Sequence, residues 1–233
     1  MSRIYKGFLA GAAALIAVTA CSASASVRQT TAARQATAAK PVEVLSVSFV
    51  SPRVGYLLGE RGEQASRVLM RKTVNGGRTW AAVHAPAAPA ADMFQSSPPP
   101  GAVGSVYFSS ESDGWAFGPA LWRTTDGGAT WRRERAPGPV TGFAVASGRM
   151  LTVITRTDKS GTASLRLYAA RAGTDDWQAV PGAAVSDVSG ASLAVSGRTG
   201  YLLASRHDLA GPVLLAGPVS RTGLARLESE ASR

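Results

Sequence analysis

The carboxylates and histidines of this 233-residue chain are the side chains that could do acid–base or metal chemistry. Hydrolysis of a glycosidic bond needs two carboxyl groups about 5 to 10 Å apart, facing one sugar. Nothing in the sequence pairs the acidic residues of the expected loops, which are Glu60, Glu63, Glu111, Asp113 and Asp158. The only two histidines, His84 and His207, are too far apart for a His-x-x-x-His zinc site. We therefore predict no catalytic residues, no metal site and no cofactor.

The only cysteine, Cys21, follows an N-terminus of the export type. Two basic residues precede an apolar run over residues 7–18, which is short for a membrane-spanning helix but typical of a signal peptide. Residues 18–21 (VTAC) resemble the lipobox of bacterial lipoproteins. The resemblance implies a signal peptide over residues 1–20, an acyl anchor of the palmitate type on Cys21, and membrane lipid as a partner. The alternatives are an ordinary secretory signal with a chance cysteine, or an uncleaved anchor.

Residues 21–40 are built almost entirely of Ala, Ser, Thr, Gln and Arg. Such a segment cannot bury enough apolar surface to offset its ordering entropy, so we expect a flexible tether. The lipid would hold the domain formed by residues 41–233 at the extracytoplasmic face of the cell membrane. With its single cysteine lipidated, that domain would have no disulfide and no thiolate chemistry.

The formal net charge of the chain is +10. Such a surface attracts anionic lipid head groups or acidic polymers of the cell envelope, and either is a candidate partner. An exported protein does not meet nucleic acid, so nucleic acid is not expected as a partner. The alternative is that the arginines only fill a solvated surface.

An eight-residue repeat dictates the expected architecture. Residues 73–80 (TVNGGRTW) recur at residues 124–131 (TTDGGATW), and the segments before them, residues 46–59 and 105–118, align without a gap. Short apolar and aromatic runs bounded by Gly, Pro and Ser indicate four strands in each unit. Four strands repeated every 40 to 50 residues or so are typical of a β-propeller blade.

Two weaker copies follow, and the first of them keeps a tryptophan at Trp177. Because no helical periodicity is present after the signal, the prediction is an all-β, β-propeller-like domain of about four four-stranded blades. The Pro-rich residues 85–101 interrupt the repeat and are expected to form a linker-like surface loop. The predicted blades cover about residues 44–84, 103–135, 139–181 and 184–228.

The octapeptide resembles the Asp-box, or BNR repeat, of bacterial sialidases and of the photosystem II assembly factor group. The second copy fits every position of that pattern, and the first has Asn75 in place of aspartate. Asp and Asn side chains accept backbone N–H groups in a turn, the paired glycines permit positive φ, and the tryptophan buries its ring. We therefore predict a structural turn formed by Asn75, Gly76, Gly77, Thr79, Trp80, Asp126, Gly127, Gly128, Thr130 and Trp131.

Aromatic residues recur at one position of three units, at Tyr56, Trp115 and Tyr201. Recurrence at one place in each blade favours packing between blades over a sugar-binding platform. Four blades do not determine whether the propeller closes into a ring, and an open propeller would expose strand edges. A small closed propeller, pairing of two partial propellers and a truncated product remain as alternatives.

Together these features predict a membrane-anchored lipoprotein of the cell envelope whose repeat domain binds a protein, or assists assembly or sensing. The alternative is a carbohydrate-active protein, either a glycoside hydrolase or a lectin, that uses a propeller cleft. The resemblance to sialidases does not extend to their catalytic residues, because the chain has no Arg-Ile-Pro motif.

Overall fold

The computed structural model describes residues 42–61, 67–91, 98–207, 211–220, 223–224 and 228–229. Every regular element in these residues is a β-strand, so the domain is all-β as predicted. No helix of the length and apolar character that a membrane crossing requires is found in this part of the chain. The predicted signal peptide, Cys21 and the tether lie outside the described residues.

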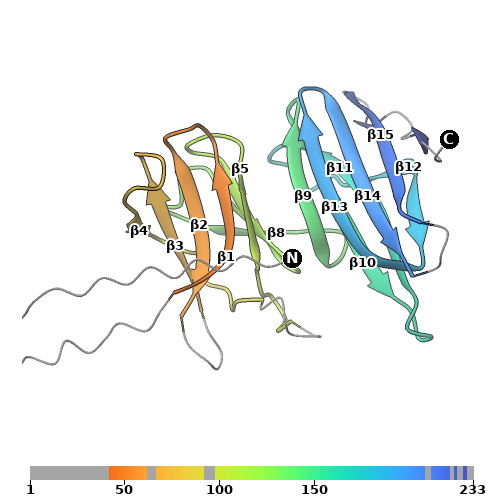
Figure 1. Ribbon diagram of the computed structural model, residues 1–233, viewed down its shortest axis with the longest axis horizontal. Helices are drawn as coiled ribbons and strands as arrows, with labels where there is room; N and C mark the ends of the chain where they lie inside the picture. The colour runs from red at the N-terminus through yellow and green to blue at the C-terminus, as the bar shows by residue number, and fades with distance from the viewer. Residues whose placement is uncertain are drawn as a thin grey trace, which may run out of the picture. The chain divides into compact units, whose positions relative to one another are not determined.

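The strands form four antiparallel sheets that follow one another along the chain as the blades of a four-bladed propeller (Figure 1). In the first two sheets the strands pair in sequence order, and each sheet ends in a three-residue strand. Their bounds are β1 Glu43–Phe49, β2 Gly55–Glu60, β3 Val68–Thr73, β4 Ala81–Val83, β5 Ser105–Phe108, β6 Gly114–Phe117, β7 Leu121–Thr124 and β8 Arg132–Glu134.

The third and fourth sheets have longer strands. The third sheet ends at Ser186, five residues past its expected end at residue 181, and the fourth position of the last sheet is divided between two short strands that both pair with β15. The bounds are β9 Val140–Ala146, β10 Arg149–Thr157, β11 Ala163–Arg171, β12 Gln178–Ser186, β13 Val188–Ser196, β14 Thr199–Arg206, β15 Val213–Ser220, β16 Gly223–Leu224 and β17 Glu228–Ser229.

Three apolar clusters lie between consecutive sheets. The first joins sheets one and two around Tyr56, Leu58 and Phe108, and the second joins sheets two and three around Trp115 and Phe143. The third joins sheets three and four and is built from the alternate aliphatic residues of β10, β11, β12 and β14. In β10 and β11, alternate side chains thus face opposite neighbouring sheets, as the period of two requires.

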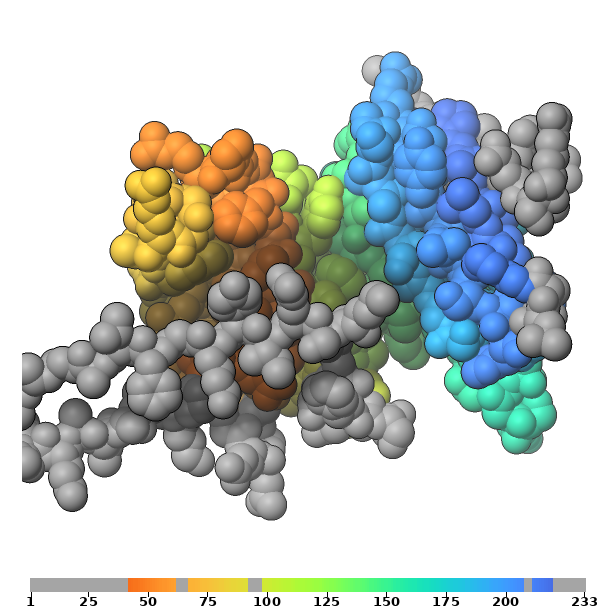
Figure 2. Space-filling model, viewed as in Figure 1, coloured from red at the N-terminus to blue at the C-terminus, as the bar shows by residue number. Residues whose placement is uncertain are grey.

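The described strands of the fourth sheet form no comparable cluster with those of the first sheet. Figure 2 shows the surfaces of both sheets, with β1 in orange and β13 and β14 in blue. The predicted packing role of Tyr201 is therefore wrong in this chain, because its side chain is exposed while Tyr56 and Trp115 are buried. Tyr201 lies on the face of β14 opposite Leu202, and only the Leu202 face packs on the third sheet.

The described part of the Pro-rich segment, residues 85–91 and 98–101, differs from a surface loop. Ala88 and Ala90 are buried in the cluster between the first two sheets, and Ala90 forms a parallel bridge with Val103. The expectation of a solvent-exposed loop is wrong for these two residues.

Candidate functional site

The second Asp-box is a turn held by the carboxylate of Asp126, between β7 and β8. Its Oδ1 atom accepts hydrogen bonds from the Thr130 backbone N–H at 2.8 Å and from Thr124 Oγ1 at 2.7 Å, and Oδ2 accepts from Thr130 Oγ1 at 2.5 Å. Thr124 Oγ1 in turn accepts from the Gly128 N–H at 2.9 Å. The polar atoms of the box are therefore used within the turn.

The first copy makes the same turn with an amide. Asn75 Oδ1 accepts from the Thr79 N–H and from Thr73 Oγ1, each at 3.0 Å, while Asn75 Nδ2 donates to Thr79 Oγ1 at 2.8 Å. An amide can take the place of the carboxylate because the Thr79 hydroxyl accepts a hydrogen bond, whereas the Thr130 hydroxyl donates one.

The paired glycines of each box supply the left-handed backbone of the turn. Gly76, Gly77, Gly127 and Gly128 have φ between 70° and 90°, where a Cβ atom clashes with the backbone. The first glycine of each pair also donates its N–H to the β1–β2 or β5–β6 loop, which fixes the box against its own sheet. The geometry is that of a turn held by its own hydrogen bonds.

The box tryptophans connect neighbouring sheets. Trp131 Nε1 donates to the carbonyl oxygen of His84 at 3.0 Å, and Trp177 Nε1 donates to that of Arg135 at 2.8 Å. Each acceptor follows directly after the last strand of the preceding sheet. For Trp80, which belongs to the first sheet, the described residues offer no such acceptor.

The hydrogen bonds of the box also set the acidity of its carboxyl group. Donation from Thr130, first by its hydroxyl and then by its backbone N–H, lowers the pKa of Asp126 to about 2. The pKa of Asp158 is lowered chiefly by the Ser160 hydroxyl, and that of Asp176 by the Thr174 hydroxyl. A general acid requires a raised pKa, so these shifts have the wrong direction for acid catalysis.

The remaining acidic candidates have separate partners. Glu111 lies 3.7 Å from Lys72 Nζ, and Asp113 lies 3.3 Å from Arg123 Nη2, both near the β5–β6 loop. Glu60 is buried at the end of β2. No group of three His, Cys, Asp or Glu side chains that could bind a metal ion occurs in the described residues. Cys21 and Glu63 lie outside them.

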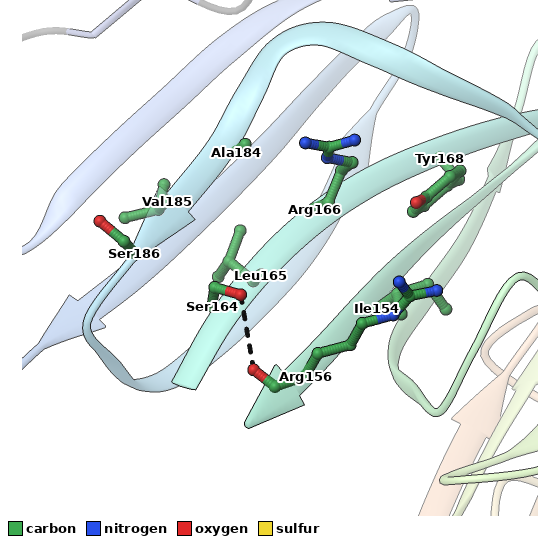
Figure 3. A pocket seen from close by; sticks show the side chains of 9 residues that line it. All are labelled: Ile154, Arg156, Ser164, Leu165, Arg166, Tyr168, Ala184, Val185 and Ser186. Carbon is green, nitrogen blue, oxygen red and sulfur yellow. Dashed lines mark hydrogen bonds between the residues drawn. The ribbon is translucent and has the colours of Figure 1, made fainter. Parts of the chain in front are cut away.

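A cavity of about 370 Å³ opens on the third sheet, over the hairpin of β10 and β11 and beside β12 (Figure 3). The pairing register places Ile154 opposite Arg166 and Arg156 opposite Ser164, so these side chains share one face of the hairpin. The lining residues are Ile154, Arg156, Ser164, Leu165, Arg166, Tyr168, Ala184, Val185 and Ser186.

A break in strand pairing flanks this cavity. Between the pairs Tyr168–Ala179 and Arg166–Ala184, one residue of β11 stands against four of β12. Those four include Pro181, which has no N–H to give to a ladder, and Gly182, whose φ is 74°. Proline and glycine at such positions produce a bulge that bends the strand away from its neighbour.

The chemistry of the cavity is cationic. Arg156 and Arg166 are exposed, and the lining contains no carboxylate. Arg156 is positioned by donation from its Nη2 atom to the Pro137 carbonyl at 2.8 Å. Guanidinium groups bind carboxylates through paired hydrogen bonds, and the ring of Tyr168 adds an apolar wall.

Sequence reasoning missed these residues. The signal that could have found them is the alternation of residues 164–168 (SLRLY), combined with the hairpin turn at residues 158–161 (DKSG). Alternation across a hairpin places both arginines on one face. The predicted site residues, in contrast, belong to the two box turns on sheets one and two, apart from Cys21, which lies outside the described residues.

No protein-family model and no curated protein sequence matches this chain. Among solved structures, it is similar to the Hadza microbial sialidase Hz136, with a TM-score of 0.53 at 13% identity over 83% of this chain and 47% of the sialidase. It is also similar to the phage phi92 endosialidase, with a TM-score of 0.50 at 11% identity over 72% of this chain and 31% of the endosialidase. The chain thus spans less than half of either sialidase.

A third solved structure, YCF48 bound to a D1 peptide, matches with a TM-score of 0.37 at 13% identity over 82% of this chain and 70% of YCF48. The proteins with which the chain shares structural similarity therefore include sialidases and a peptide-bound protein. At these identities the two sialidase matches establish the β-propeller fold of the chain and no activity.

Proposed function

We propose that this protein is a lipid-anchored binding module at the extracytoplasmic face of the cell membrane, and that the cavity on the third sheet binds an acidic segment of a protein partner. The observation that carries the proposal is the pair Arg156 and Arg166 on one face of the β10–β11 hairpin, with no carboxylate in the cavity lining. In this role the protein positions a partner for assembly or sensing and catalyses no reaction.

The anchoring half of the proposal rests on the sequence around Cys21. A chain with a formal net charge of +10 would also be drawn to the anionic surface of the membrane or to acidic envelope polymers. Replacing Cys21 by Ser is expected to abolish labelling with a radioactive fatty acid and to release the protein from washed membranes. Labelling that survives the substitution would contradict the anchor.

The binding half is tested with the full-length protein in detergent and a fluorescent hexaglutamate peptide, with hexaglutamine as the uncharged control. Arg166→Ala is expected to weaken hexaglutamate binding about tenfold or more, because a hydrogen bond to a charged group contributes about 1.5 to 3 kcal/mol. Arg78→Ala is the matched control, since Arg78 is also exposed but lies in the first box turn. If both variants weaken hexaglutamate binding equally, the binding is non-specific charge attraction and the proposed site is contradicted.

A second candidate function is recognition of an acidic glycan. Two arginines beside the Tyr168 ring would also suit a carboxylated sugar, with the ring as a stacking surface. Oligogalacturonate and a neutral glucan of equal length distinguish this candidate from the first. Binding of oligogalacturonate without binding of hexaglutamate would favour the lectin, and cleavage of either glycan would favour a hydrolase.

A further inference from the structure

The contact between the first two sheets shows how one blade of this protein covers the next. The ring of Tyr56 in β2 stacks on Phe108 in β5, and its hydroxyl donates to the Glu111 carbonyl at 2.6 Å. Phe108 also meets the edge of Trp131, whose indole N–H reaches back to the first sheet at His84. One sheet supplies the covering aromatic, and the following sheet supplies the phenylalanine and the tryptophan.

The contact between the second and third sheets repeats this arrangement. Trp115, at the position equivalent to Tyr56, packs on Phe143 with ring centroids 5.2 Å apart. Trp177 donates its indole N–H back to Arg135 at the end of the second sheet. The pairing of covering aromatic and covered phenylalanine is therefore a recurrent interface of the fold.

The first sheet presents the covered half of this interface, and none of the described sheets packs on it. Val47 and Phe49 are 53% and 48% exposed, whereas Val106 and Phe108, which occupy the same positions one repeat later, are 5% and 3% exposed. Phe49 meets the edge of Trp80 with centroids 6.2 Å apart, as Phe108 meets Trp131 at 6.3 Å. We name the surface formed by Val44, Val47, Phe49 and Trp80 the leading face.

The fourth sheet presents the covering half, and no other sheet in the described part of the chain packs against it. Tyr201 occupies the position of Tyr56, and it lies on the side of β14 that points away from the third sheet. Tyr201, Leu203 and Leu214 are 36% to 41% exposed. On β13, β14 and β15 the register places only Ser, Thr, Ala and Pro side chains beside them. The charged residue nearest in register is Glu228 of β17, which pairs with Ala216. We name the surface formed by Tyr201, Leu203 and Leu214 the trailing face.

We infer that a second copy of this chain covers both surfaces, with the trailing face of each copy packed on the leading face of the other. The two faces are the complementary halves of an interface that the chain already builds between its own sheets. Head-to-tail contacts of this kind close into rings when the rotation permits. Two copies of four sheets make eight, which lies within the range of four to eight blades typical of propellers.

Large apolar side chains at the surface favour this pairing. Single exposed apolar residues are common on protein surfaces, but an exposed cluster with the composition of a buried core marks an interaction site. Arg71 is the one charged side chain in the row of the leading face that contains Val47 and Leu57, and its aliphatic stem can lie along an apolar partner while its guanidinium stays in water.

Cross-linking between two differently tagged full-length copies tests the inference. One copy carries Val47→Cys and the other carries Leu203→Cys, and a mixed disulfide between the two tags is the expected product. Unsubstituted protein controls for Cys21, and Ser160→Cys, at an exposed turn away from both faces, controls for random collision. Cross-linking of Val47→Cys only with itself would overturn the head-to-tail arrangement.

A single chain that carries both Val47→Cys and Leu203→Cys distinguishes contact between two copies from contact between the first and fourth sheets of one copy. An intramolecular disulfide at the mass of one chain would mean that the chain closes its own ring, and would overturn the inference. Sedimentation equilibrium supplies a second readout: two chains are expected for the unsubstituted protein and one chain for Phe49→Asp and for Leu203→Asp. Because both side chains are already exposed, the two variants are expected to keep the circular dichroism and the Tm of the folded chain. A mass of one chain for the unsubstituted protein would also overturn the inference.

Discussion

The rings of Tyr56 and Phe108 lie parallel, with 4° between their planes and 3.5 Å between their centroids. The two residues are 52 positions apart and belong to different sheets, so their contact couples the first sheet to the second. The hydroxyl of Tyr56 then reaches the backbone of the β5–β6 loop. This contact gives the first of four predictions.

Tyr56→Phe is expected to destabilise the domain by about 1 kcal/mol, because it removes one hydrogen bond and keeps the stacked ring. Tyr56→Ala is expected to cost about 3 to 5 kcal/mol, since it leaves a cavity against Phe108. Urea denaturation followed by tryptophan fluorescence measures both values. Equal losses in the two variants would show that the ring contributes nothing beyond its hydroxyl.

Gly114→Ala is expected to destabilise the domain by about 1 to 3 kcal/mol, as overpacking does in well-packed cores. An added Cβ atom would strike the ring of Phe108, which cannot withdraw because Tyr56 and Trp131 hold it. Gly55→Ala is the matched variant, because its Cβ atom would strike the exposed ring of Phe49. Phe49 can move into solvent, so a smaller loss is expected. A larger loss for Gly55→Ala in the same urea titrations would contradict this account.

The acid stability of the second box is expected to depend on Asp126. Its pKa of about 2 in the folded state lies below the ordinary value of 3.8, so the carboxylate stabilises the fold above pH 3.8. This contribution is lost as the pH falls from about 3.8 to about 2. Asp126→Asn makes the turn of the first box, where Asn75 does not titrate, and is expected to show a smaller fall of Tm over that interval.

Thermal unfolding of both proteins between pH 5 and pH 2 measures this difference. Asp158 and Asp176 titrate in the same direction in both proteins, so only the difference between the two curves reports on Asp126. Parallel curves would mean that the turn gains nothing from the charge.

Trp131→Phe and Trp177→Phe are each expected to cost about 1 kcal/mol for the lost bond to a carbonyl oxygen of the preceding sheet, in addition to the cost of the smaller ring. Trp122→Phe is the control for ring size, because Trp122 is partly buried like Trp131 and Trp177 and its indole N–H has no acceptor in the described residues. Chemical denaturation of the three variants compares them. If Trp122→Phe costs as much as Trp131→Phe and Trp177→Phe, the hydrogen bond between sheets has no measurable value.

Local chemistry explains why the box turns and the sheets could be predicted from the sequence. The turn around Asp126 uses only atoms of residues 124–131, together with one carbonyl of its own sheet, so its geometry is contained in the repeat. The strands follow from short alternating runs between glycines. Both features depend on neighbours along the chain.

Features that depend on distant segments could not be predicted in this way. Tyr201 has the local pattern of Tyr56, yet it is exposed because no further sheet of the described chain follows it. The cavity arises where the Pro181–Gly182 bulge bends β12 away from β11, and nothing in the local sequence states which side chains then face the opening. Ala88 and Ala90 are buried because a neighbouring segment covers them.

The tryptophan contacts between sheets have a consequence for how such chains change over generations. Trp131 and Trp177 donate to main-chain oxygens, which every amino acid possesses, so the preceding blade can vary its side chains without losing the contact. A gene duplication that adds a blade with such a tryptophan therefore also adds its hydrogen bond to the preceding blade. A deletion removes the blade and that hydrogen bond together. At the two joins that carry such a tryptophan, neighbouring blades can diverge in sequence while the contact between them stays intact.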